Sequence, residues 1–366
     1  MPNSRDLKFL NALNSIPNIG AATLRMLKNK FGSYEAAWRA EGKDLESAGL
    51  PTLALRSIPW KRPSINPDKE MERLVKEEIW VFTDDQPEYP SILKEIPNPP
   101  VMLYGRGVPN ILKKESLYLA VVGTRRPTTY GLEATEKIVH ELAVSGVVTV
   151  SGLATGIDSR AHEATLDARG VTIAVLGSGL DPNSIFPPEN IGLARRIAEA
   201  GGAVISEYSP GTPAVKEHFP MRNRIISGLS RGVVVVEARE KSGALITARL
   251  ALEQNRDVFA VPGSVFSLTS AGPHALIKEG AKIVASAQDI LEEYGMGYND
   301  NKEGKPRGLL EERESIILEL LEEPQSVDFI KEKIGLDTAA IVASLSLLEL
   351  KGFIKNLGGD TYQKMV

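Results

Sequence analysis

Short, almost continuously apolar runs recur along the middle of the chain and alternate with segments in which apolar residues follow a helical spacing. The seven runs cover residues 117–123, 147–152, 172–177, 202–207, 233–238, 257–263 and 282–286. Strands that are apolar on both faces are typical of a parallel sheet covered by helices on both sides. The pattern therefore predicts an α/β fold, with a Rossmann-like, doubly wound, mostly parallel sheet.

The two ends of the chain have helical patterns and are separated from the middle by proline-rich or polar stretches. The N-terminal part reads as two helices joined by a short hairpin, with Gly32 ending the second helix, as in helix-hairpin-helix or SAM-like domains. The C-terminal part reads as three helices and a hairpin, the order of a winged helix. The predicted domains are a helical domain at 1–50, a linker or extension packed on the core at 51–110, a Rossmann-like domain at 111–296, a linker at 297–308 and a winged-helix-like domain at 309–366.

Composition limits the chemistry of the protein. The chain has 366 residues, of which 42% are hydrophobic and 25% charged, as is typical of globular proteins. Because it contains no cysteine, disulfides, thiolate metal sites and cysteine nucleophiles are excluded. The N-terminus lacks a signal-peptide pattern, and no apolar run approaches the roughly 18 residues that span a bilayer. We expect a cytoplasmic protein with no membrane partner, and the net charge of -4 gives no sign of a basic coat.

Small and polar residues follow several of the predicted strands, at the edge where open α/β sheets bind ligands. Backbone N–H groups in such turns can bind phosphate oxygens. The candidate phosphate-binding residues are Gly123, Thr124, Ser151, Gly152, Gly177, Ser178, Ser242 and Gly243. The same residues also suit simple tight turns, but Arg125 and Arg126 follow the first of them and favour an anion.

A basic segment with an aromatic residue is the strongest local feature. Residues 216–256 carry eight Lys and Arg against four Glu. The candidate DNA-binding residues are Lys216, Phe219, Arg222, Asn223 and Arg224, together with Arg125 and Arg126. Cations along the backbone and a ring that stacks on a base are what single-stranded nucleic acid requires. The alternative is a solvated helix face with Phe219 in the core.

Signatures of nucleotide-dependent enzymes are weak in this sequence. A P-loop is absent, GSGLDP at 177–182 lacks the third glycine of a dinucleotide fingerprint, and the four histidines show no catalytic or metal-binding spacing. We expect no metal, no cofactor and no catalytic residue. The alternative is a nucleotide or nucleoside-phosphate hydrolase that uses the same pocket, with Glu207, Asp181 or Glu237 as its carboxylate.

A series of motifs between residues 115 and 290 resembles one known family. VVGTRRPTTYG, VSGLATGIDSRAHEATL, AVLGSGLDPNSIFPPEN and KEHFPMRNRIISGLSRG occur in order, and together they are similar to the bacterial DNA-processing protein A (DprA, or Smf) family. The resemblance implies a non-enzymatic protein that binds single-stranded DNA, forms homodimers and helps load the RecA recombinase in natural transformation. It also implies that Arg125, Lys216 and Phe219 line the DNA pocket. The loop around His274 departs from the family pattern, in which an asparagine is more usual nearby.

The flanking domains give weaker signals of DNA contact. SIPNIGAATLRML resembles a helix-hairpin-helix, but Asn18 stands where a glycine is usual, which favours a scaffold or protein-contact domain. The predicted recognition helix of the winged-helix-like domain has no Arg, Lys, Asn or Gln before Lys351. Such a helix cannot read base edges in a major groove, so we expect a protein-contact or regulatory module.

Overall fold

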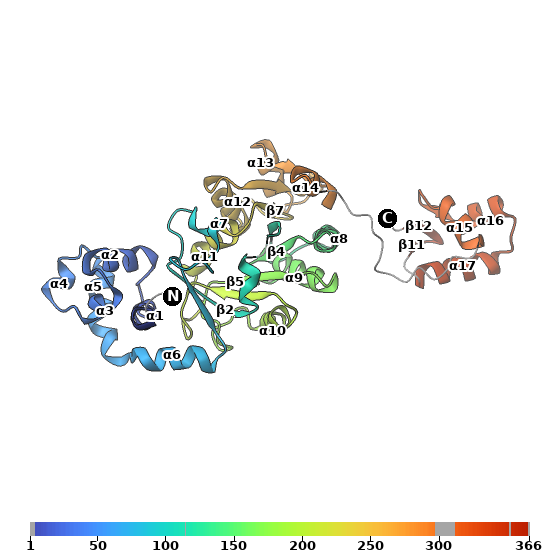
Figure 1. The fold of residues 1–366 in the computed structure, drawn as a ribbon. Helices are drawn as coiled ribbons and strands as arrows, with labels where there is room; N and C mark the ends of the chain where they lie inside the picture. Colours follow the sequence, from blue (N-terminus) through green and yellow to red (C-terminus); the bar gives the residue numbers. More distant parts are fainter. Residues whose placement is uncertain (1–3, 114, 297–311, 351–352, 365–366) are drawn as a thin grey trace. The chain divides into compact units, whose positions relative to one another are not determined.

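The computed structural model describes residues 4–113, 115–296, 312–350 and 353–364 (Figure 1). The chain divides into two compact units, Met1–Tyr298 and Asn299–Val366. The first unit contains the helical N-terminal region and the sheet. The predicted linker at 297–308 lies outside the described residues.

A nine-stranded sheet forms the centre of the first unit, in the order β1-β2-β6-β5-β4-β3-β7-β8-β9. Its strands are β1 (Trp80–Thr83), β2 (Met102–Gly107), β3 (Tyr118–Val122), β4 (Val148–Ser151), β5 (Thr172–Leu176), β6 (Ala203–Ser206), β7 (Gly232–Val235), β8 (Asp257–Ala260) and β9 (Lys282–Ile283). The strands from β3 to β9 pair in parallel, and the winding order reverses between β3 and β7. The predicted Rossmann-like, doubly wound sheet and its seven strands are confirmed.

The stretch expected to be a linker with a little extended structure, 51–110, contains more regular structure than its sequence pattern suggests. β1 and β2 pair antiparallel with each other, and β2 pairs antiparallel with β6, so this stretch extends the sheet. The Trp80 ring covers Gly105, where an added Cβ would lie 2.1 Å from a ring carbon. The two strands were not predicted from the sequence, because the proline-rich stretch between them gives no sustained pattern of apolar and polar residues.

Helices cover both faces of the sheet, as the apolar strands require. On one face lie α8 (Thr129–Val144), α9 (Ile157–Asp167) and α14 (Ala287–Glu293). On the other lie α7 (Ser91–Lys94), α11 (His218–Gly228), α12 (Gly243–Glu253) and α13 (Ala271–Lys278). α10 (Ile191–Glu199) packs on β6, and short 3-10 turns cover Arg62–Ser64, Pro109–Lys113 and Pro188–Asn190. Apolar clusters therefore lie on both faces of the sheet.

The N-terminal helices pack against the β1, β2 and β6 side of the sheet. They are α1 (Ser4–Asn14), α2 (Ala21–Phe31), α3 (Tyr34–Arg39), α4 (Lys43–Glu46), α5 (Thr52–Lys61) and α6 (Pro67–Lys76). Gly32 ends α2, as predicted, and it has the left-handed conformation. Asn18 also has a positive φ of 67°, and its side chain donates to Ser57 Oγ at 3.0 Å. Asparagine tolerates this conformation, which is why it can replace the usual glycine of the hairpin.

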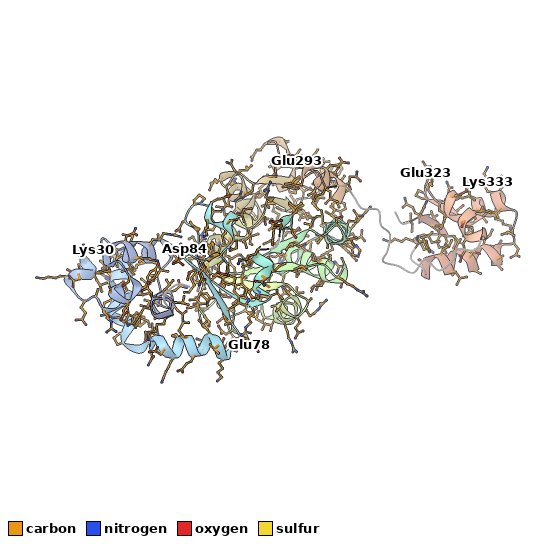
Figure 2. All side chains as sticks on the ribbon, in the orientation of Figure 1. Lys30, Glu78, Asp84, Glu293, Glu323 and Lys333 are labelled. Atoms are coloured by element: carbon orange, nitrogen blue, oxygen red, sulfur yellow. The ribbon has the colours of Figure 1, made fainter. Side chains whose placement is uncertain are left out.

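The second unit has the three helices and hairpin predicted for a winged helix. Its elements are α15 (Glu312–Leu320), β10 (Gln325–Ser326), α16 (Val327–Ile334), α17 (Thr338–Leu350), β11 (Ile354–Gly358) and β12 (Thr361–Lys364). They surround a separate apolar core that includes Ile317, Ile341 and Leu345. Glu323 and Lys333 are exposed on its outside (Figure 2).

Candidate nucleic-acid interface

Two pockets lie at the carboxyl edge of the sheet, beside the switch point between β3 and β7. The first, of about 250 Å³, is formed by the turn after β3 and by the first turns of α11 and α12. The second, of about 240 Å³, is formed by the turn after β4 and by residues 186–189. Arg125 and Phe219 line both pockets and lie between them. This is the place where open α/β sheets bind ligands.

Arg125 and Phe219 form a cation–π pair at the centre of this edge. The Arg125 guanidinium lies 5.4 Å from the centroid of the Phe219 ring. Arg125 is exposed, whereas Phe219 is half-buried and therefore does not belong to the core, unlike the alternative considered from the sequence. A guanidinium within about 6 Å of a ring is attracted to its π face. The pair thus holds a positive charge beside an aromatic surface.

Three other predicted DNA-binding residues differ in their relation to the two pockets. Lys216 is exposed in the segment before α11, and Arg126 is exposed after β3; neither is among the residues that line the two pockets. Asn223 lines the first pocket, and its Nδ2 donates to the carbonyl of Gly243 at 3.4 Å. The structure therefore brings Asn223 to the first turn of α12, whereas Lys216 and Arg126 add charge at the surface.

Arg222 has a different place from the one expected of a phosphate-binding cation. It is 4% exposed, and its Nη1 donates to the carbonyls of Gly152, at 2.6 Å, and Val175. Burial lowers the pKa of Arg222 to about 10, against the opposing effect of the nearby Asp158 carboxylate. Arg222 borders both pockets, but its guanidinium joins the ends of β4 and β5, so it supports the wall of the site.

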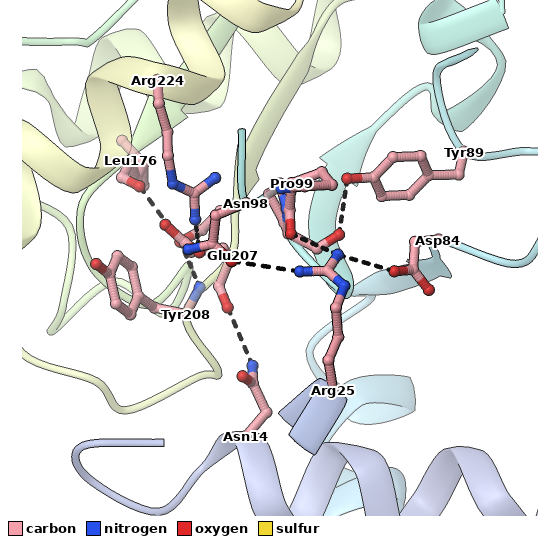
Figure 3. Close-up of polar contacts among 12 residues, drawn as sticks. Asn14, Arg25, Asp84, Tyr89, Asn98, Pro99, Leu176, Glu207, Tyr208 and Arg224 are labelled. Carbon is pink, nitrogen blue, oxygen red and sulfur yellow. Dashed lines mark hydrogen bonds and ion pairs between the residues drawn. The ribbon is translucent and has the colours of Figure 1, made fainter. Parts of the chain in front are cut away.

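Arg224 lies outside both pockets, contrary to the expectation that it binds a phosphate. Its Nη2 donates to Glu207 Oε2 at 2.5 Å, and the two side chains are 8% and 11% exposed. Figure 3 shows the pair next to Asn14 of α1, whose Nδ2 donates to the Glu207 carbonyl at 3.0 Å. The guanidinium therefore connects α11 to the strand β6, on the side of the N-terminal helices.

The predicted phosphate-binding turns divide into two groups. Those that line the pockets are Gly123, Thr124, Gly152, Ser242 and Gly243. Ser151, Gly177 and Ser178 are not among the lining residues. Ser151 is buried and its hydroxyl donates to the Val121 carbonyl at 2.6 Å, whereas Ser178 donates to the Gly179 carbonyl at 3.3 Å. Gly177 instead makes room for Phe219, because an added Cβ would lie 3.2 Å from Phe219 Cδ1.

The three carboxylates considered for a hydrolase do not line either pocket. Glu207 is paired with Arg224, and Asp181 accepts from the Gly211 N–H at 2.5 Å and from the Ser184 hydroxyl at 2.8 Å. Glu237 accepts from the backbone N–H and hydroxyl of Thr128 and from the Thr269 hydroxyl, at 2.9, 2.8 and 2.6 Å. Each of the three carboxylates therefore holds neighbouring segments together.

One residue of the site, Phe186, was not singled out by sequence reasoning. Phe186 lines the second pocket with 43% of its surface exposed. The sequence feature that could have identified Phe186 is the FPPEN segment after Asp181, which was interpreted only as part of a family motif. Asp158 lines the first pocket, accepts from the Gly152 N–H at 3.1 Å, and has its pKa raised by burial. The segment VSGLATGIDSRAHEATL predicts this residue in the polar turn after a strand, together with Ser151 and Gly152.

Among the residues that the structure describes, no three His, Cys, Asp or Glu side chains gather as the ligands of a metal ion would. Nor is any helix in these ranges long and apolar enough to cross a membrane.

Comparison with known proteins places this architecture in one family. The family model for DNA recombination-mediator protein A matches residues 80–295, and a model for the DprA winged helix domain matches residues 301–360. Protein Smf of Synechocystis sp. is 36% identical over 401 residues, which cover 100% of this chain and 100% of that protein. DNA processing protein DprA of Bacillus subtilis is 49% identical over 206 residues, which cover 56% of this chain and 68% of that protein.

Solved structures agree with this assignment. DNA processing protein A of Streptococcus pneumoniae has 36% identity and a TM-score of 0.61, over 75% of this chain and 98% of that chain. DNA processing protein A of Helicobacter pylori, whose structure concerns its single-stranded DNA binding mode, has 31% identity and a TM-score of 0.53, over 59% of this chain and 95% of that chain. The chain therefore belongs to the DNA recombination-mediator protein A family, whose members are named DprA or Smf.

Proposed function

We propose that this chain binds single-stranded DNA at the carboxyl edge of its sheet. The observation that carries the proposal is the Arg125 guanidinium over the Phe219 ring, between two pockets. Charge for the phosphates and a ring for a base are the two components of single-strand binding. The Helicobacter pylori relative supports the same class of ligand.

The first pocket suits a phosphate of the strand. Arg125 and Asn223 border it together with Gly243, the first residue of the 11-residue helix α12. An added Cβ at Gly243 would meet no atom within 4 Å, so there is space for a ligand at this helix N-terminus. The backbone N–H groups and the helix dipole favour an anion there. Lys216 and Arg126, exposed nearby in the chain, would add attraction for the remaining backbone.

A titration of a labelled single strand across a salt series tests the proposal. Arg125→Ala should weaken binding and reduce the slope of log K against log salt by about 1, because one phosphate contact is lost. Phe219→Ala should weaken binding by about 1 to 3 kcal/mol with the slope unchanged. Arg195→Ala is the matched control, since that side chain is 80% exposed and pairs with Glu199 on α10. If the wild type does not bind, or Arg125→Ala binds as well as the control, the proposal is wrong.

We propose further that the bound strand is passed to the RecA recombinase, as the family description of recombination mediator suggests. This role places the protein in the cytoplasm during DNA uptake in natural transformation, where it protects the incoming strand. The test is RecA filament formation on a strand already coated with a single-strand binding protein. The wild type should accelerate assembly, and Arg125→Ala should not; equal rates with and without the wild type would contradict the role.

A homodimer would place two such sites on one strand and raise avidity through effective concentration. Apolar side chains are exposed in the loop after β8 and on the edge strand β9. They are Val265, Phe266, Leu268 and Ile283, with 79%, 95%, 71% and 55% exposure. Exposed apolar patches mark interaction sites. Sedimentation should show a dimer that Phe266→Asp dissociates; a wild-type monomer at all concentrations would contradict the assembly.

We also propose that the site acts by binding and not by turnover. The three carboxylates considered for hydrolysis are bonded within the fold and do not line either pocket. Incubation with a panel of nucleotides and a labelled single strand should yield no product. Product formation that Arg125→Ala abolishes would instead establish the hydrolase.

A further inference from the structure

The second pocket differs from the first in its chemistry. Its walls include Phe186, Pro187 and Pro188, and the exposed Glu189 also lines it. Among its lining residues the cations are Arg125, shared with the first pocket, and Arg222, whose Nη1 already donates to two backbone carbonyls. The first pocket is lined by the same two arginines and by one carboxylate, that of Asp158, so the two pockets differ in their walls. Apolar and aromatic walls suit a nucleobase.

Phe186 is exposed although it has an apolar partner beside it. Its ring centroid lies 5.9 Å from that of Phe219, and the two ring planes are tilted by 49°. The side chain still exposes 43% of its surface while it lines the pocket. The two rings therefore present neighbouring aromatic surfaces, with the Arg125 guanidinium on the Phe219 ring. Successive bases of a single strand stack on such neighbouring rings in proteins that bind it.

We propose that Phe186 is a second base-stacking residue and that residues 152–155 and 186–189 form a nucleobase subsite. This inference rests on the proposed single-strand binding and makes it more specific. A phosphate occupies the first pocket at Arg125 and the N-terminus of α12, and an adjoining base enters the second pocket and stacks on Phe186. The strand thus crosses the sheet edge from α12 towards the 186–189 turn.

The test compares two strands of equal length, one of thymidine nucleotides and one with abasic sugars throughout. Phe186→Leu keeps the apolar bulk and removes the ring, so it should weaken binding of the thymidine strand about tenfold, at unchanged salt slope. Binding of the abasic strand should not change. Phe186→Tyr keeps the ring and should bind both strands as the wild type does. Trp60→Leu is the matched control, because Trp60 is 73% exposed on α5, outside both pockets.

Two results would overturn the inference: equal weakening of both strands by Phe186→Leu, or no weakening of either. These are distinct from failure of the proposed function. If single-strand binding itself is wrong, the wild type binds neither strand. If only the second subsite is wrong, Phe219→Leu still weakens the thymidine strand selectively, whereas Phe186→Leu does not. Circular dichroism of each variant checks that the fold is intact.

Discussion

The buried pair of Arg224 and Glu207 predicts a large loss of stability when the arginine is replaced. The two side chains are 8% and 11% exposed, and their closest atoms lie 2.5 Å apart. Arg224→Met would leave the Glu207 carboxylate buried without its partner, next to the contact of Asn14 with the β6 end (Figure 3). Breaking a buried pair in this way costs about 3 to 5 kcal/mol. We expect the free energy of unfolding to fall by this amount at pH 8.

The pH dependence of this loss follows from the carboxyl group. Burial raises the pKa of Glu207, and the charge and hydrogen bond of Arg224 oppose that effect. Without Arg224 the folded carboxyl binds a proton more readily than the unfolded one, so the variant regains stability as the pH falls from 8 to 5. The double variant Arg224→Met/Glu207→Leu buries no unpaired charge, and we expect its stability to be within about 1 kcal/mol of wild type.

Urea denaturation followed by fluorescence at pH 8 and pH 5 measures these differences. Single-strand binding, measured where the variant is fully folded, should stay within twofold of wild type because Arg224 does not line either pocket. A loss below about 1 kcal/mol at pH 8, or a loss that does not shrink in acid, would refute the reasoning about the buried pair. A loss of DNA affinity equal to that of Arg125→Ala would show that Arg224 binds DNA directly.

Three further substitutions probe the support of the site and the core. Glu237→Gln weakens the contacts that hold the Thr128 turn. It should lower the free energy of unfolding, measured in a urea titration, by about 1 to 3 kcal/mol, and it should also weaken DNA binding. Wild-type values for both quantities would contradict this prediction. Burial lowers the pKa of His162 to about 3, below its unfolded value, so stability should fall by about 1.4 kcal/mol per pH unit below pH 6.5 from this residue alone. His162→Gln should remove that slope, and equal slopes would exclude the effect. Gly177→Ala places a Cβ 3.2 Å from Phe219 Cδ1. It should weaken single-strand binding several-fold and change the free energy of unfolding by less than about 1 kcal/mol. A binding titration and urea denaturation together check this prediction.

The sheet and its helices could be predicted from the sequence because the pattern of apolar residues within each segment shows which of its faces are buried. A parallel strand covered on both faces is apolar at every position, and all seven such runs form strands of the sheet. Gly32 ends α2 because glycine adopts the left-handed conformation without a steric penalty. β1 and β2 were missed because they lie in a proline-rich stretch and depend on pairing with β6, which is distant in the sequence.

The sequence predicted which turns lie together at the carboxyl edge of the sheet, but not every side chain that lines the two pockets there. Topology brings the turns after parallel strands to one edge, so Thr124, Arg125 and Gly152 meet there. Phe186 was missed because it lies in a long turn after β5 with no periodic pattern, and only folding brings its ring to Phe219. Phe219 itself was identified because charge and an aromatic ring are adjacent in the sequence.

The roles of the arginines were decided by tertiary structure alone. Arg222 and Arg224 belong to the same basic segment, and its charge count predicted that both face DNA. The fold instead buries Arg222 against the carbonyls of Gly152 and Val175, and Arg224 against Glu207, while Arg125 remains exposed. The sequence determined which cations lie near the sheet edge. Packing of distant segments decided which of them remain exposed, since a guanidinium binds whichever acceptor the fold places within reach.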